Sequence, residues 1–123
     1  MNPISAKFTV GFRILLAASI LAITYLTLSK PTGNVHGLIN DKVAHGLSFF
    51  LLTFIMDMAF PRMQMWGKVL ILFAYGLGIE LLQLQLAYRH FSWWDWLADI
   101  VGVLLYLPLL KPVHQLVARV FPA

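Results

Sequence analysis

The chain has 123 residues, of which 60% are hydrophobic and only 11% charged, whereas an ordinary soluble domain is roughly 45–50% apolar. A soluble fold of this length has too little interior to bury so much apolar surface, so the composition predicts a membrane protein. The net charge of +4 comes without the basic runs of a nucleic-acid groove, and the absence of cysteine excludes disulfides, thiolate metal sites and cysteine nucleophiles.

Four segments are apolar over about 20 residues, the length that spans a bilayer. In chain order they run from about residue 8 to 28, 42 to 60, 66 to 86 and 93 to 110. The first is interpreted as a retained helix rather than a signal peptide, because its apolar stretch exceeds the usual length of about 7–15 residues and no small-residue cleavage site follows.

The chain after the fourth segment has an amphipathic pattern. Residues 113–122 set apolar side chains opposite His114, Gln115 and Arg119. A short C-terminal interfacial helix or a frayed end is predicted there. The length leaves no room for a separate soluble domain, so residues 1–123 are predicted to form one all-α domain, a bundle of four transmembrane helices.

The distribution of basic residues predicts the topology. Four spans place both termini on the same side as the loop between the second and third helices. That side carries six of the nine Lys and Arg residues, namely Lys7, Arg13, Arg62, Lys68, Lys111 and Arg119. The other side carries Lys30, Lys42 and Arg89. By the positive-inside rule both termini are predicted to be cytoplasmic, and the loops at about residues 29–41 and 87–92 to face outward.

Ionisable residues gather at the outward ends of the predicted helices. Four of the five acids are there, Asp41, Glu80, Asp95 and Asp99, accompanied by Lys42, His45, Gln83 and Arg89. Ionisable side chains are costly in hydrocarbon, so such a cluster is a functional-site hypothesis by default. These eight residues are the predicted ligand-binding site.

Helical spacing places these residues on shared faces. Asp41 and His45 are four residues apart, as are Asp95 and Asp99, so each pair shares one face of its helix. Glu80 lies six residues before the predicted end of the third helix, which puts it about 9 Å below that end.

Asp99 lies six residues after Trp93, at the same predicted depth. Gly76 and Gly102 lie on the faces of Glu80 and Asp99 and allow close helix approach. The sequence thus predicts an outward-opening polar cup made by three helices, with Arg89 on its lip.

Structural roles are open for several members. Asp41 suits a helix N-cap, and Ser92-x-x-Asp95 resembles a capping box. Lys42 and Arg89 suit snorkelling to the membrane interface.

His45 suits a hydrogen-bonded bundle histidine, and Gln83 suits interhelical hydrogen bonding worth about 0.6 kcal/mol. Glu80 and Asp99 are too deep for caps, so their structural alternative is a buried ion network. The fifth acid, Asp57, lies close in depth to Arg13 and not far from Arg62, and is interpreted as part of a structural ion pair.

Three spaced motifs in this order resemble the VanZ-like family of small bacterial membrane proteins. They are Asp41-Lys42-Val43-Ala44-His45, Gly78-Ile79-Glu80-Leu81-Leu82-Gln83, and Arg89-His90-Phe91-Ser92 leading to Asp95-Trp96-Leu97-Ala98-Asp99-Ile100-Val101-Gly102. The resemblance covers about residues 38–106. One departure is Asp99, where the family commonly has Asn.

The resemblance implies a multi-pass protein of the bacterial inner membrane that acts on the cell envelope. The family takes its name from a protein associated with teicoplanin resistance. The first hypothesis is therefore an outward site that binds a lipid head group or a lipophilic glycopeptide such as teicoplanin, with a role in envelope homeostasis or antibiotic resistance.

The second hypothesis is a membrane enzyme acting on a lipid-linked envelope precursor. Its candidate catalytic residues are His45, Glu80, Asp95 and Asp99, acting with a divalent metal or as general acid and base. No cofactor motif is present, and a divalent metal is left open. The third hypothesis is a structural protein whose buried network only specifies packing. The sequence does not determine the oligomeric state.

Overall fold

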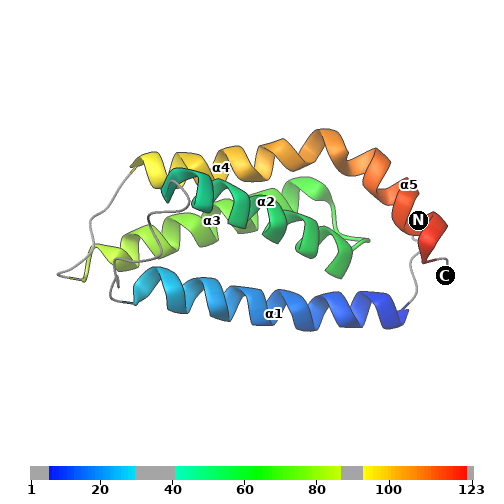
Figure 1. Cartoon of the computed structure of the whole chain (residues 1–123), viewed down its shortest axis with the longest axis horizontal. Helices are drawn as coiled ribbons and strands as arrows, with labels where there is room; N and C mark the ends of the chain where they lie inside the picture. The colour runs from blue at the N-terminus through cyan, green and yellow to red at the C-terminus, as the bar shows by residue number, and fades with distance from the viewer. Residues whose placement is uncertain (1–5, 30–40, 87–92, 122–123) are drawn as a thin grey trace.

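The computed structural model describes residues 6–29, 41–86 and 93–121, apart from the side chain of Asp41. Within them the chain forms helices α1 (Ala6–Leu28), α2 (Asp41–Ala59), α3 (Met65–Gln83), α4 (Trp93–Tyr106), the 3₁₀ turn η1 (Leu107–Leu109) and α5 (Leu110–Val120) (Figure 1). In this part of the chain four helical segments are long and apolar enough to cross a membrane, 6–28, 42–59, 65–83 and 93–120. The predicted all-α bundle of four spans is confirmed.

The third span ends earlier than predicted. Helix α3 stops at Gln83, because the next amide groups of Gln85 and Leu86 bond the carbonyls of Leu82 and Gln83, three residues back, and so tighten the chain into turns. Glu80 therefore lies three residues from the end of α3, about 4.5 Å, and not at the predicted 9 Å. The apolar pattern continues to Leu86 and does not reveal this change of hydrogen bonding.

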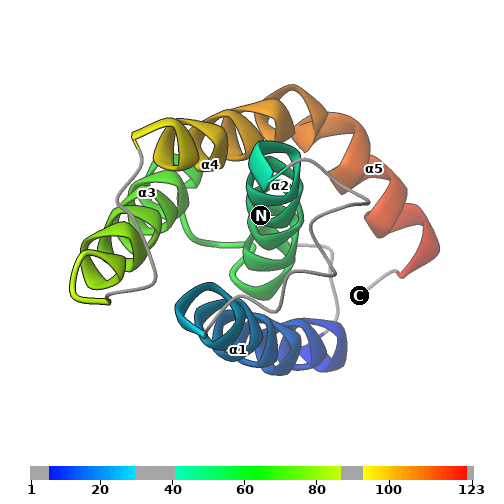
Figure 2. The ribbon, with the colours of Figure 1, turned by 60° about the vertical axis from the view of Figure 1, so that its left-hand side comes forward.

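The fourth span bends after Tyr106. Pro108 lies in η1, and proline lacks the N–H that an α-helix requires at that point, so the chain passes through a 3₁₀ turn before α5. Figure 2 shows α5 turning away from the line of α4. Helix α5 buries Val117 and exposes Lys111 and Arg119. The tail is thus helical, one of the two predicted outcomes.

Helix α2 lies between α1 and α4 (Figure 2) and packs most extensively against α4. Two glycines permit this close approach. A Cβ atom on Gly102 would overlap the backbone of Gly46, and a Cβ on Gly46 would lie 3.3 Å from the carbonyl oxygen of Ala98. The sequence prediction that Gly102 lies at a close helix contact is confirmed.

The apolar side chains divide between an interior and an outer surface. The interior cluster comprises Leu16, Phe49, Leu52, Met56, Ala59, Leu72 and Val103. Large apolar side chains such as Leu21, Tyr25 and Trp94 are exposed on the outer surface, as expected where helices face lipid.

The antiparallel helices define two ends of the bundle. At one end α2 and α4 begin and α1 and α3 finish, and we call it the Lys42 end. At the other end α2 turns into α3 and α5 follows α4, and we call it the Asp57 end. Buried polar side chains are found at both ends.

Candidate functional site

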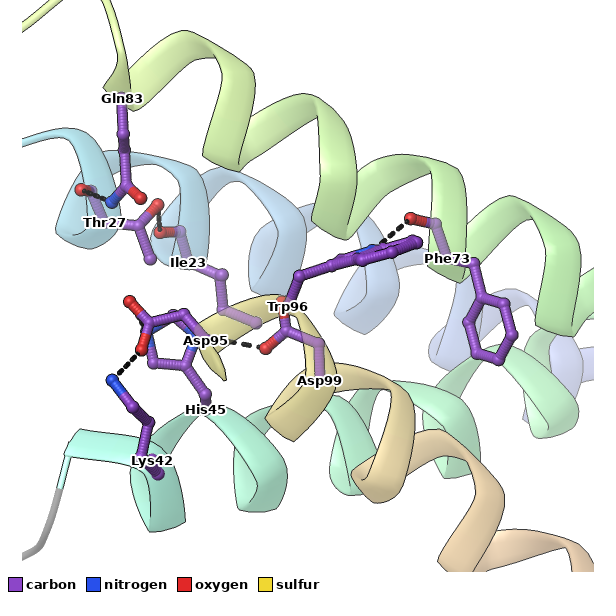
Figure 3. Close-up of polar contacts among 9 residues, drawn as sticks. All are labelled: Ile23, Thr27, Lys42, His45, Phe73, Gln83, Asp95, Trp96 and Asp99. Atoms are coloured by element: carbon purple, nitrogen blue, oxygen red, sulfur yellow. Dashed lines mark hydrogen bonds and ion pairs between the residues drawn. The ribbon is translucent and has the colours of Figure 1, made fainter. Parts of the chain in front are cut away.

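The Lys42 end holds a polar cluster contributed by α2, α3 and α4, and we call it the His45 cluster. It comprises Lys42, His45, Glu80, Asp95 and Asp99. Lys42 donates its Nζ to Oδ1 of Asp95, and the Nδ1 of His45 lies 3.0 Å from Oδ1 of Asp99 (Figure 3). Glu80 is fully buried and Asp99 is 4% exposed. The structure therefore brings together five of the eight predicted ligand-binding residues.

Helical periodicity accounts for much of this geometry. Lys42 and His45 lie three residues apart on α2, and Asp95 and Asp99 lie four apart on α4, so each helix presents its two groups on one face. Because α2 and α4 begin at the same end, the two faces meet and form two pairs, Lys42 with Asp95 and His45 with Asp99.

A glycine of α3 makes room for the His45–Asp99 pair. A Cβ atom on Gly76 of α3 would lie 3.0 Å from Oδ2 of Asp99 and 3.4 Å from the ring of Phe49. A larger residue there would press against the Asp99 carboxylate. The predicted role of Gly76 in close approach is thus confirmed, and its neighbour is a functional candidate.

Three side chains of the cluster have the geometry of metal ligands. One ligand atom from each of His45, Glu80 and Asp95 lies within 4.8 Å of the others. Two carboxylates and an imidazole form a donor set suited to a divalent cation such as Mn²⁺ or Zn²⁺.

Asp99 differs from Asp95 in its position relative to the imidazole. Asp99 contacts Nδ1, whereas the His45 Nε2 lies 4.0 Å from Oδ2 of Asp95. A carboxylate on one ring nitrogen orients a histidine and leaves the other nitrogen for a metal. Asp99 is therefore placed to orient the His45 ring, and Asp95 is placed to bind the same metal ion as His45.

Two polar side chains near the cluster connect helices instead. Gln83 donates its Nε2 to the carbonyl oxygen of Thr27, 2.7 Å away on α1, which is the interhelical hydrogen bonding considered from the sequence (Figure 3). Trp96 donates its Nε1 to the carbonyl oxygen of Phe73 on α3, at 3.2 Å. Trp96 thus connects α4 to α3.

The remaining predicted members fall outside the described residues. Asp41 is the first residue of α2, but its side chain is not described, so its capping role stays a prediction. Arg89 and the Ser92 of the capping-box pattern lie in residues 87–92, which the structure does not describe.

An apolar groove runs beside the His45 cluster, between α2 and α4. It has a volume of about 550 Å³, and Val43, Leu47, Phe50, Val101 and Leu105 are among its lining residues. Lys42 also lines it and so belongs both to the groove and to the polar cluster. The sequence pattern does not reveal this groove, since its lining residues come together only where α2 packs against α4.

The Asp57 end holds a second polar group, the Asp57 cluster, which comprises Asp57, Lys68, Tyr106 and His114. Lys68 donates its Nζ to Oδ1 of Asp57 at 2.7 Å, and Oδ2 lies 2.7 Å from the Tyr106 hydroxyl and 2.6 Å from Nε2 of His114. The predicted ion pair at Asp57 is confirmed, but its partners are not the expected arginines.

Arg13 makes other contacts, donating its Nε to the carbonyl oxygen of Ala59 at 2.9 Å and placing its guanidinium 4.7 Å from the centre of the Phe60 ring. Depth along the helix had suggested Arg13 as the partner of Asp57. The choice instead depends on how each helix is rotated, which depth does not specify.

Comparison with known proteins identifies a family. The model of the family described as VanZ/LLP1 matches residues 6–114, which is most of the chain and includes both polar clusters. No curated protein and no solved structure matches the chain significantly.

Proposed function

The chain belongs to the VanZ/LLP1 family of membrane proteins, and we propose that its His45 cluster binds the anionic head group of a cell-envelope lipid. One observation carries the proposal. Buried ionisable side chains from three helices converge at a point that shares Lys42 with an apolar groove. A polar cluster and an apolar groove that share a lysine match a lipid, which has a polar head and an apolar chain.

The charge of the cluster determines how an anion is held. Its described members include three carboxylates but only two basic groups, Lys42 and His45. A phosphate group placed directly among them would therefore be repelled. A divalent cation held by His45, Glu80 and Asp95 removes that repulsion and attracts phosphate oxygens. We therefore expect head-group binding to depend on a divalent cation.

Lys42 and the groove complete the proposed site. Lys42 is exposed over 46% of its side chain, so its ammonium group reaches a head group while still contacting Asp95. Arg89, predicted on the lip, would add a second cation. The groove takes the first part of an acyl or isoprenoid chain, which gains free energy by contact with its apolar lining.

The proposed setting is the bacterial inner membrane, with both termini cytoplasmic and the site at the outer leaflet, as the positive-inside rule predicts. A lipid-linked envelope molecule is available there. A lipophilic glycopeptide such as teicoplanin would present a polar group beside an apolar one to the same site, which connects the proposal to envelope homeostasis and resistance.

Lipid retention by the purified protein tests this function. The protein is held in phosphatidylcholine nanodiscs with added phosphatidic acid, in Mn²⁺ or in EDTA, and bound lipid is counted by native mass spectrometry. We expect one more equivalent of phosphatidic acid in Mn²⁺ than in EDTA. Glu80→Gln should remove this difference, because it removes a carboxylate ligand.

Arg119→Gln is the control, since this exposed residue lies on α5 at the Asp57 end and should leave the Mn²⁺ effect unchanged. Equal retention in Mn²⁺ and EDTA would reject the metal-bridged site. Soluble teicoplanin added to the Mn²⁺ sample should displace the lipid if both use the cluster.

A membrane enzyme acting on a lipid-linked phosphate is the second candidate. The observation that favours it is the grouping of His45, Glu80 and Asp95 within 4.8 Å, with Asp99 positioning the imidazole. A divalent cation bound there would polarise a phosphoryl oxygen and lower the pKa of bound water. Release of inorganic phosphate from phosphatidic acid in Mn²⁺, lost in Glu80→Gln, would support catalysis, and intact lipid after prolonged incubation would favour binding alone.

A further inference from the structure

Asp57 is a buried carboxylate whose two oxygens are both engaged. It is 1% exposed, and its oxygens contact Lys68, Tyr106 and His114 at 2.6–2.7 Å. Three polar contacts satisfy the charge of a carboxylate in a dry site. The same contacts hold the Lys68 ammonium and the His114 ring in place from α3 and α5.

A pocket of about 320 Å³ opens beside this cluster. Its polar lining comes from Asp57, Lys68, Lys111 and His114, and its apolar lining from Pro61, Met63, Met65 and Leu110. Lys68 is 1% exposed, so a buried lysine forms part of the wall. Lys111 is exposed and makes no ion pair with any described residue, so its charge is available to a ligand.

The surroundings of the pocket favour an anion. The pocket is lined by two lysines, a histidine and one carboxylate, that of Asp57. This carboxylate is already engaged by three donors. Helix α3 begins at Met65 in the pocket wall and has no acidic residue in its first turn, so the positive end of its dipole is not offset there. Both the side chains and the helix end attract negative charge.

We propose that this pocket binds a phosphate monoester, with the Lys68 and Lys111 ammonium groups contacting the phosphate oxygens. The apolar wall formed by Pro61, Met63, Met65 and Leu110 would contact the ester side of the ligand. The protein then has a second anion site, at the opposite end of the bundle from the His45 cluster. This site needs no metal, because its own residues supply the positive charge.

Two exposed cations of α5 provide a matched test. Lys111 lines the pocket, whereas Arg119 does not, and both lie on the same short helix. The protein is held in phosphatidylcholine nanodiscs with EDTA, which removes metal-dependent binding at the His45 cluster. Affinity for added phosphatidic acid, a phosphate monoester, is measured by native mass spectrometry.

We expect Lys111→Gln to weaken binding by about tenfold or more, in line with the loss of one charge-assisted contact. Arg119→Gln should bind as the unchanged protein does. An equal loss in both variants would show attraction by net charge alone and would overturn the proposal. Equal retention of phosphatidylcholine and phosphatidic acid would overturn it as well.

The inner wall of the pocket needs a variant that keeps the fold. Replacing both members of the buried pair, Asp57→Leu with Lys68→Met, removes the ammonium without leaving an unpaired charge. The folded double variant should lose phosphatidic acid binding in EDTA and keep the Mn²⁺-dependent equivalent at the His45 cluster. Retained binding in EDTA would reject Lys68 as a ligand.

Soluble glycerol 3-phosphate identifies the source of the phosphate. Displacement of phosphatidic acid by millimolar glycerol 3-phosphate would support a pocket that takes its ligand from solution. Lipid binding without displacement would support a lipid head group, held in addition through its chains. Binding of neither compound would reject the site. Glu80→Gln should leave the results in EDTA unchanged, so the outcome for this pocket is independent of the outcome for the His45 cluster.

Discussion

The two polar clusters of this protein both bury ionisable groups but stabilise them differently. In the Asp57 cluster one carboxylate meets three donors, so the acid is fully satisfied by its neighbours. In the described part of the His45 cluster three carboxylates share Lys42 and His45. The first arrangement is complete without a cation, whereas the second has the charge and the geometry to take one. Burial of charge in a membrane helix thus does not define a single kind of site.

Breaking the Asp57 pair should have the largest effect on stability. Asp57→Leu alone leaves the Lys68 ammonium buried without its carboxylate, and we expect the free energy of unfolding to fall by about 3–5 kcal/mol. Unfolding by SDS titration, followed by circular dichroism, measures this change. The double variant with Lys68→Met should recover most of the loss, and a double variant as unstable as the single one would argue against the pairing.

Pushing α2 and α4 apart should cause the next largest loss of stability, and it should also disturb the His45 cluster. Gly102→Ala places a Cβ atom against the backbone of Gly46, one residue from His45, and we expect a loss of about 1–3 kcal/mol together with weaker Mn²⁺ binding. The same unfolding assay and Mn²⁺ electron paramagnetic resonance measure the two effects. Gly78→Ala is the control, because a Cβ there meets nothing within 4 Å. Similar losses in both variants would point to helix propensity rather than contact.

Substitution of Asp99 distinguishes a residue that orients His45 from one that binds the metal ion directly. Asp99→Asn keeps the size of the side chain but weakens its hold on His45, so we expect Mn²⁺ affinity to fall by about 10–100-fold with little change in the unfolding free energy. Titration of Mn²⁺ by electron paramagnetic resonance provides the measurement. Asp95→Asn should lower the affinity further, since it removes a ligand oxygen, and the reverse order would exchange the two roles.

Lys42→Ala should have the smallest effect on folding. Its ion pair with Asp95 is half exposed, and such pairs contribute about 0–1 kcal/mol. We expect the unfolding free energy to stay within about 1 kcal/mol while Mn²⁺-dependent retention of phosphatidic acid falls. A large loss of stability with unchanged lipid retention would make Lys42 a structural residue and would narrow the difference between the two clusters.

Much of the candidate site could be predicted from the sequence because it depends on local regularities. The apolar length of each segment located the four spans, and a spacing of four residues placed His45 on the face of Asp41 and Asp95 on the face of Asp99. Antiparallel spans then put Glu80 at the same end. These inferences need only the period of the helix and the thickness of the membrane.

Other features follow from contacts between helices, and sequence spacing does not contain them. The end of α3 at Gln83 follows from a change to tighter turns within an unbroken apolar run. The rotation of α3 about its axis directs Gln83 toward Thr27 on α1, and the packing of α4 against α3 places Trp96 near Phe73. The groove between α2 and α4 has Gly46 and Gly102 in its lining, and these two glycines lie opposite each other on separate helices.

The sequence by itself determined the membrane class, the four spans, the family resemblance and a set of eight polar residues that includes the five of the His45 cluster. Only the tertiary structure decided that Asp57 pairs with Lys68 and His114 rather than with Arg13, and that Asp95 and Asp99 have different neighbours on His45. The physical reason is that hydrophobic length and helical period act along one helix. The partner of a buried charge depends on the rotation and separation of two helices, which the packing of the whole bundle sets.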